Sequence, residues 1–230
     1  TSLTTTTNAA GLFLIPDVAT GAAVLEIDGT TVPIATDYPR VRLRTNITAG
    51  RDNTLSRPIA LQFIQGAAVS VSPTGLMAAE RLTLKLETPD TNFLTAETNS
   101  IVLEVPSGTS VNFTDVAGSS LTLTQLEGSR TPFALPSGIF SSAIVQIAPY
   151  GATFSQGGKL TFPNSDNYAA GAQVKLYRLN QTAGSAVLGS FIEISTATVS
   201  ADGKAIETQD GVVTESGCYF VAALRPVQTL

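Results

Sequence analysis

Apolar and polar residues alternate with a period of two in at least four segments of the chain. In each segment the apolar side chains fall on one face of an extended backbone and the polar ones on the other, which is typical of half-buried β-strands. The segments are Val41–Arg44, Leu82–Glu87, Leu121–Thr124 and Val174–Tyr177. No stretch combines a helical period over three turns with capping residues. The pattern therefore predicts antiparallel sheet.

Residues that favour turns separate the alternating segments. They are Asp28-Gly29, Ala49-Gly50, Pro106-Ser107-Gly108, Pro136-Ser137-Gly138, Gly157-Gly158, residues 163–167 and Asp202-Gly203. Glycine, proline, asparagine and aspartate adopt turn dihedral angles easily, and a turn every ~8 to 15 residues is typical of β-sandwiches. The sequence thus predicts an all-β protein built from antiparallel β-sandwiches.

A domain boundary is predicted near Gln65-Gly66. One strand-rich block ends at Pro58–Phe63, and another opens at Val69. The expected units are a small N-terminal sandwich, residues 1–66, and a larger C-terminal region, residues 67–230. The intervening segment is so short that the two units should pack together rather than swing freely.

The chain lacks several of the side chains that enzymes most often use for catalysis and metal binding. It contains no histidine, no tryptophan and one cysteine, Cys218. Histidine is the usual general base near neutral pH and the commonest metal ligand, so histidine-dependent nucleophilic and zinc sites are excluded. We expect no catalytic residue, no cofactor and no metal site, and hence no enzyme. An enzyme that acts through carboxylates is a weaker alternative, for which spacing singles out no pair.

Charge and hydropathy restrict the partners. Charged residues make up 13% of the chain, against about a quarter in typical proteins, and the net charge is -5. A negative chain is not attracted to phosphate backbones or anionic lipid. No uninterrupted apolar run approaches the ~18 residues needed to span a bilayer. We expect no nucleic-acid partner and no membrane insertion, and the threonine-rich, charge-poor composition favours an extracellular location.

Several single residues have simple structural interpretations. Cys218 lies in an apolar run and is predicted to be a small buried hydrophobe rather than a reactive thiol. Arg40, Arg42 and Arg44 should share one strand face, either as a solvated surface or as a surface for a sugar or protein partner. Lys175 alternates with leucine and valine and should face solvent, which argues against an isopeptide cross-link in the core.

The N-terminal sequence resembles the carboxypeptidase-regulatory-like domain, a transthyretin-like seven-stranded sandwich of bacterial surface proteins. The resemblance rests on the threonines at 4–7, the Gly11-Leu12-Phe13 turn, the turn Val18–Gly21 and the following Ala23–Gly29. It implies a threonine strand at the start of the chain. Because this domain normally has one or two strands before that strand, the N-terminal sandwich is expected to be incomplete.

The C-terminal region resembles the ZU5-like β-domain. Residues 143–154 fit a strand followed by a Pro-aromatic-Gly turn, and residues 158–164 fit a second strand that closes in Leu-Thr-Phe-Pro. The resemblance implies that 174–179 and 197–213 complete the module. Self-cleaving members of this group use a His-Phe-Ser sequence, which is absent here, so self-cleavage is not expected. Both modules serve as stalks and spacers, so they predict fold rather than activity.

An incomplete sandwich exposes a strand edge that another chain can pair with. We expect the chain to begin inside a longer precursor, through either processing or truncation. If Thr1 is the mature terminus, a strand from a neighbouring copy could fill the gap, and such head-to-tail contacts build a fibre. The candidate assembly residues are Thr1, Leu3, Thr5, Thr7, Leu224, Val227 and Leu230.

These observations predict a structural subunit of an extracellular bacterial filament or surface layer, a homopolymer whose partners are copies of itself. The alternative is a binding or spacer module from a larger secreted adhesin-like protein. In that case Arg40, Arg42, Arg44 and exposed loops would recognise a surface glycan or another protein.

Overall fold

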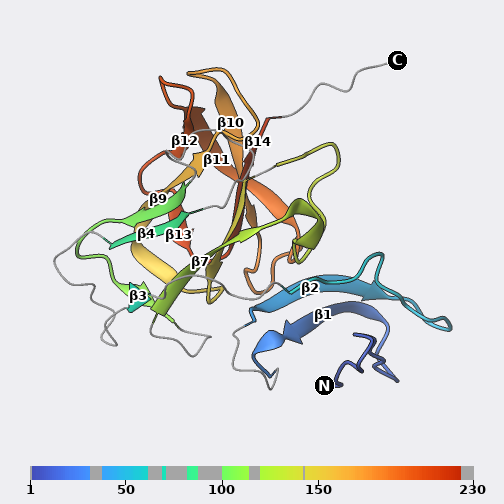
Figure 1. Ribbon diagram of the computed structural model, residues 1–230. Helices are drawn as coiled ribbons and strands as arrows, with labels where there is room; N and C mark the ends of the chain where they lie inside the picture. Colours follow the sequence, from blue (N-terminus) through green and yellow to red (C-terminus); the bar gives the residue numbers. More distant parts are fainter. Residues whose placement is uncertain are drawn as a thin grey trace, which may run out of the picture.

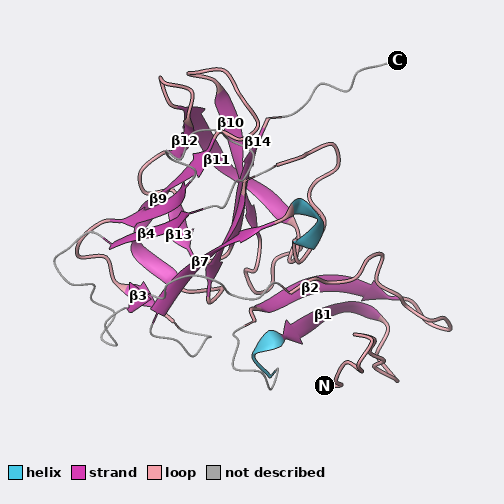
Figure 2. Cartoon of the chain, viewed as in Figure 1, coloured by secondary structure: helices cyan, strands magenta, loops and turns pink. Residues whose placement is uncertain are grey.

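The computed structural model describes residues 2–31, 38–61, 69–70, 82–87, 100–113, 120–141 and 143–223, and it is all-β (Figures 1 and 2). The first strands are β1 (Gly21–Asp28), β2 (Arg40–Ile47), β3 (Val69–Ser70), β4 (Leu82–Glu87), β5 (Ser100–Val105), β6 (Val111–Asn112) and β7 (Ser120–Leu126). The later strands are β8 (Ile144–Ala148), β9 (Thr153–Pro163), β10 (Gln173–Leu179), β11 (Phe191–Val199), β12 (Ala205–Thr208), β13 (Val213–Glu215) and β14 (Cys218–Ala222). Two short 3-10 turns are η1 (Gly29–Thr31) and η2 (Gly128–Arg130).

The strands form one large sheet and one hairpin. The large sheet runs in the order β3-β7-β8-β14-β10-β11-β12-β9-β5-β4, with β6 and β13 also paired to β9. β4 at one end of the sheet also contacts β7, which is next to the other end, so the sheet curls into a nearly closed barrel. β1 and β2 form a separate two-stranded sheet. The strand pairs in the described residues are antiparallel, as predicted.

The four alternating segments are confirmed as strands, in β2, β4, β7 and β10. The Asp202-Gly203 turn joins β11 to β12 as expected. The prediction of a turn at Gly157-Gly158 is wrong, because both residues lie inside β9. A Cβ atom on Gly157 would stand 2.0 Å from the carbonyl oxygen of Gly211. These glycines therefore serve a close approach of two backbones, which is the other common reason for glycine in a strand.

Two segments of the N-terminal region differ from the sequence patterns. Residues 58–61, predicted to belong to a strand, form none, although Ile59 and Leu61 pack against buried side chains. Residues 2–20, where the first resemblance implies a threonine strand, also form no strand. The predicted boundary at 65–66 lies outside the described residues.

Two hydrophobic cores lie on opposite faces of the central strands. In β14, Tyr219 and Val221 belong to the barrel interior, whereas Cys218 and Phe220 belong to a second core on the outside. Every residue of β14 and β8 is buried, because these strands are covered on both faces. This explains the continuous apolar run around Cys218, since a strand buried on both sides has no polar face.

The outer core is rich in aromatic side chains. Phe220 stacks on Tyr177 with ring centroids 4.9 Å apart and meets Phe191 edge-on at 5.1 Å. The segment 127–143 contributes Phe133 and Ile139 to the same core. Further cover comes from Ile59, Leu61 and the β1–β2 hairpin, which Figure 1 shows lying along one side of the barrel.

Candidate interaction surfaces

The β1–β2 hairpin has one apolar face and one charged face. Its register pairs Leu25 with Leu43 and Ile27 with Val41, and of these side chains Ile27, Val41 and Leu43 pack in the outer core. Val41 is completely buried. Since two strands alone are only marginally stable in water, this contact with the barrel is what holds the hairpin in place.

The charged face carries the arginines singled out from the sequence, and their placement on one face is confirmed. Arg40 pairs with Asp28 at 2.7 Å, and Arg42 pairs with Glu26 at 2.6 Å across the two strands. Burial opposes ionisation of Asp28, but hydrogen bonds from Thr30 and Arg40 outweigh it and lower the pKa of the Asp28 carboxyl. Two of the three arginines are thus engaged within the hairpin. Arg44 forms no ion pair with any residue that the structure describes.

The free edge of β2 is closed by the loop that follows β10. The backbone N–H of Arg42 donates to Oε1 of Gln181 at 2.7 Å, and Nε2 of Gln181 donates to the carbonyl of Arg42 at 2.9 Å. The N–H of Arg44 donates to the carbonyl of Leu188 at 3.1 Å. This edge of the hairpin is therefore satisfied by the barrel.

The outer edge of β1 is different. Within the described part of the chain β1 pairs with β2 alone, and no backbone hydrogen bond joins residues 2–20 to it. An eight-residue strand with one neighbour presents a row of backbone donors and acceptors to solvent. Its outward-facing side chains include Val24, which is 58% exposed. This edge is suited to accept a further strand.

The predicted assembly residues lie in the two terminal segments. Leu3, Thr5 and Thr7 are exposed and belong to no strand. Thr1 lies outside the described residues, and so do Leu224, Val227 and Leu230, which follow the last described residue, Ala223. Residues 2–7 thus form no strand and no backbone hydrogen bond with other residues that the structure describes.

A compact loop follows this N-terminal stretch and was not anticipated from the sequence. Oδ1 of Asn8 accepts hydrogen bonds from the N–H groups of Ala10 and Leu12 at 2.9 and 3.0 Å. The loop presents Leu12, 66% exposed, and Leu14, 76% exposed, with Phe13 between them. These three consecutive residues expose apolar side chains to solvent.

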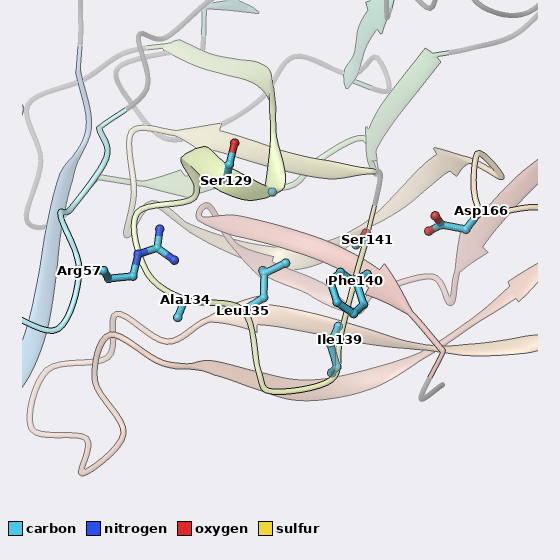
Figure 3. A pocket seen from close by; sticks show the side chains of 9 residues that line it. Arg57, Ser129, Ala134, Leu135, Ile139, Phe140, Ser141 and Asp166 are labelled. Carbon is cyan, nitrogen blue, oxygen red and sulfur yellow. The ribbon is translucent and has the colours of Figure 1, made fainter. Parts of the chain in front are cut away.

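An open cleft of about 600 Å³ lies on the segment 127–141 (Figure 3). Leu135, Ile139 and Phe140 form its apolar part, and Phe140 is 68% exposed. Figure 3 places Arg57 at one end and Asp166 at the other. Sequence reasoning missed the cleft because Arg57 and Asp166 lie far apart in the chain.

The buried titratable groups do not form a reactive site. Cys218 is fully buried, which confirms the sequence prediction, and burial raises the pKa of its thiol well above the ordinary value despite a hydrogen bond with Tyr150. A buried, protonated thiol is a poor nucleophile. Lys175 is 37% exposed and pairs with Glu193 at 2.7 Å, as expected for a solvent-facing lysine.

No group of three or more metal-binding side chains occurs within the residues that the structure places. Within the same residues, no helix has the length and apolar character needed to cross a membrane.

In comparisons with known proteins the chain matches no protein family, no curated protein and no solved structure. Within the described residues, the surfaces open to a partner include the β1 edge, the exposed 12–14 loop and the cleft.

Proposed function

We propose that this chain is a structural subunit of an extracellular bacterial filament or surface layer, assembled head to tail by β-strand addition. In this proposal residues 1–66 are an incomplete carboxypeptidase-regulatory-like sandwich, and residues 67–230 are a ZU5-like β-domain. The observation that carries the proposal is the outer edge of β1, which no described residue pairs with, in a hairpin whose other edge contacts Gln181 and Leu188.

The chain also contains segments that could supply the missing strand. Residues 2–7 are exposed, belong to no strand and make no backbone hydrogen bond to another described residue. A strand that adds to β1 would satisfy backbone groups on both partners, and main-chain hydrogen bonds supply much of the affinity in such complexes. Leu3 is 45% exposed, and pairing would also bury part of its apolar side chain, which is favourable.

The geometry of such a contact leads to a polymer. The donor segment and the β1 edge are different surfaces of the same chain, so the contact is heterologous and leaves one donor and one acceptor free at each end. Such a polymer grows until the free subunits are used up or its ends are capped. The low content of charged residues, 13%, reduces the repulsion between packed copies.

The test compares the full chain with two replacements of equal length. Residues 1–7 in one variant, and residues 224–230 in the other, are exchanged for a Gly/Ser segment. We expect the full chain to form filaments by electron microscopy, and one replacement to leave folded monomers by light scattering and circular dichroism. A synthetic peptide of the effective segment should then cap filament growth.

The proposal is wrong if the full chain stays monomeric at every concentration tested, or if both replacements assemble as the full chain does. A monomer that captures a glycan or another protein would instead support the binding or spacer module. The open cleft between Arg57 and Asp166 is the observation that favours this second function.

A further inference from the structure

We propose that the cleft of one copy receives the Leu12-Phe13-Leu14 loop of a second copy, with Asp17 of that copy reaching Arg57. The inference rests on the proposed self-assembly and assigns a second contact to the junction between copies. It concerns surfaces distinct from the β1 edge, so each contact can be tested without the other.

Four of the exposed large hydrophobic residues lie in the 12–14 loop and the cleft. The full set among the described residues is Leu3, Leu12, Phe13, Leu14, Val24, Phe140 and Val187. Five of the seven precede residue 25, and Phe140 lines the cleft. Leu12 and Phe140 are 66% and 68% exposed, so the isolated chain does not cover one surface with the other. Contact between them requires a second copy.

The apolar loop is held in shape before it binds. The N–H of Asn8 donates to the carbonyl of Leu12 at 2.9 Å, and the Asn8 side chain accepts from the N–H groups of Ala10 and Leu12. Gly11 has a φ of +74°, a left-handed conformation that glycine adopts without cost. A preorganised loop loses little conformational entropy when it docks, which favours binding.

The cleft matches this loop in size and polarity. Its volume of about 600 Å³ falls within the ~300–1,000 Å³ of sites that enclose small ligands, so it has room for the side chains of a short segment. Leu135 and Ile139 lie beside the exposed ring of Phe140 in Figure 3. An aromatic side chain such as Phe13 could pack against that ring with favourable offset or edge-on geometry.

Charge gives the docked loop a direction. Asp17 follows Leu14 by three residues and forms no ion pair with a described residue, and the first 39 residues contain no lysine or arginine. Arg57 donates through one terminal nitrogen to the carbonyl of Thr131 at 2.8 Å and through Nε to the carbonyl of Pro58 at 3.5 Å, and the guanidinium has further N–H groups to donate. Arg57 supplies a positive charge at its end of the cleft, so Asp17 of the docked loop is attracted to that end.

Single-cysteine cross-linking tests the contact in the full chain, because the native thiol of Cys218 is buried. Leu14→Cys in one preparation and Ser141→Cys in another should form a mixed disulfide dimer when combined under mild oxidation. Leu14→Cys combined with Ser107→Cys, an exposed serine outside the cleft, is the matched control. A yield equal to that control overturns the proposal. The proposal is also overturned if the double variant Leu14→Cys/Ser141→Cys forms an intramolecular disulfide at high dilution as fast as it forms intermolecular ones.

Equilibrium measurements give an independent readout. Phe13→Ala and Phe140→Ser should each weaken association by about tenfold or more in sedimentation experiments, because buried aromatic anchors dominate interface energies. Val187→Ser removes an exposed apolar side chain outside both surfaces and should have no effect. Asp17→Asn should weaken association and reduce its dependence on salt. If Phe13→Ala and Phe140→Ser associate like Val187→Ser, the cleft contact does not exist.

The two proposals fail in distinguishable ways. Loss of assembly in the strand replacements together with unchanged assembly in Phe13→Ala and Phe140→Ser would overturn the cleft contact alone. The reverse pattern would overturn strand addition and leave the cleft contact standing. A full chain that never associates would overturn both.

Discussion

The side-chain amide of Gln181 pairs with both backbone groups of Arg42, 139 residues away in the sequence. It accepts from the N–H at 2.7 Å and donates to the carbonyl at 2.9 Å, as a neighbouring strand would. The Gln181 side chain thus occupies the backbone groups of Arg42 that another strand could pair with, and it attaches the hairpin to the barrel. Because β2 is closed in this way, β1 is the edge of the hairpin that no described residue pairs with.

Replacing Gln181 with alanine should loosen the hairpin. The change removes two hydrogen bonds to partly buried backbone groups, a loss of about 1–3 kcal/mol in local stability. Hydrogen exchange should show faster exchange of the Arg42 amide, with the β8 and β14 amides unchanged. Gln209→Ala, at an exposed turn, is the control. Equal exchange at Arg42 in both variants would mean that Gln181 does not hold the hairpin.

Gly189→Ala should detach the hairpin from the barrel, because the added methyl group would clash with Leu43 of β2. Gly189 has a φ of +82°, and a Cβ atom there would stand 2.7 Å from the Cβ of Leu43. Gly184 has a similar φ of +77° with open space around it. Alanine in the left-handed region costs about 1–2 kcal/mol at either site, but only Gly189→Ala adds the clash.

Thermal unfolding should therefore show a larger loss of stability for Gly189→Ala than for Gly184→Ala. Hydrogen exchange of the β2 backbone amides, including that of Leu43, should become faster in Gly189→Ala but not in Gly184→Ala. Equal losses would indicate that the loop after β10 moves aside without cost.

Local patterns in the sequence were sufficient for the strands but not for their partners. The alternation in Leu121–Thr124 and Val174–Tyr177 correctly predicted β7 and β10, because one face of each strand is more buried than the other. The apolar run at Cys218 correctly predicted burial. The pairing of Gln181 with Arg42 had no local signal, since a glutamine in a loop has many possible partners.

The error at Gly157-Gly158 has a physical cause. A glycine pair is compatible with a turn and with the close approach of another backbone, and the sequence does not distinguish these two uses. The cleft was missed for a related reason, because its lining residues Arg57, Phe140 and Asp166 come from segments far apart in the sequence. Contacts between distant segments are the part of this molecule that a single sequence leaves open.

Gly157→Ala should destabilise the barrel strongly. Its Cβ would meet the carbonyl oxygen, carbonyl carbon and Cα of Gly211 at 2.0, 2.4 and 2.9 Å, and these backbone atoms cannot turn away as a flexible side chain can. We expect a loss of at least about 3 kcal/mol in the free energy of unfolding by denaturant titration. Gly217→Ala, whose nearest neighbour would be a Tyr219 ring carbon at 3.9 Å, should cost far less. Similar losses would show that the turn at Gly211 can relax.

The stability of the fold should fall at alkaline pH. Burial raises the pKa of the Cys218 thiol above its ordinary value of 9.0, and burial also raises the pKa of the Tyr150 and Tyr219 phenols above 10.0. The folded chain therefore keeps protons that the unfolded chain releases. Stability contributed by these groups is complete below pH 9 and declines as pH rises, by at most about 1.4 kcal/mol per pH unit for each group.

Two variants separate the thiol from the phenols. Cys218→Ala should flatten the decline in melting temperature between pH 9 and pH 10, whereas Tyr219→Phe should flatten it only above pH 10. Both changes also cost stability at neutral pH, Cys218→Ala by leaving a small cavity and Tyr219→Phe by removing the hydrogen bond from its hydroxyl to the carbonyl of Glu215, so the slopes are compared rather than the absolute values. Parallel slopes for both variants and the parent chain would show that other groups govern alkaline unfolding.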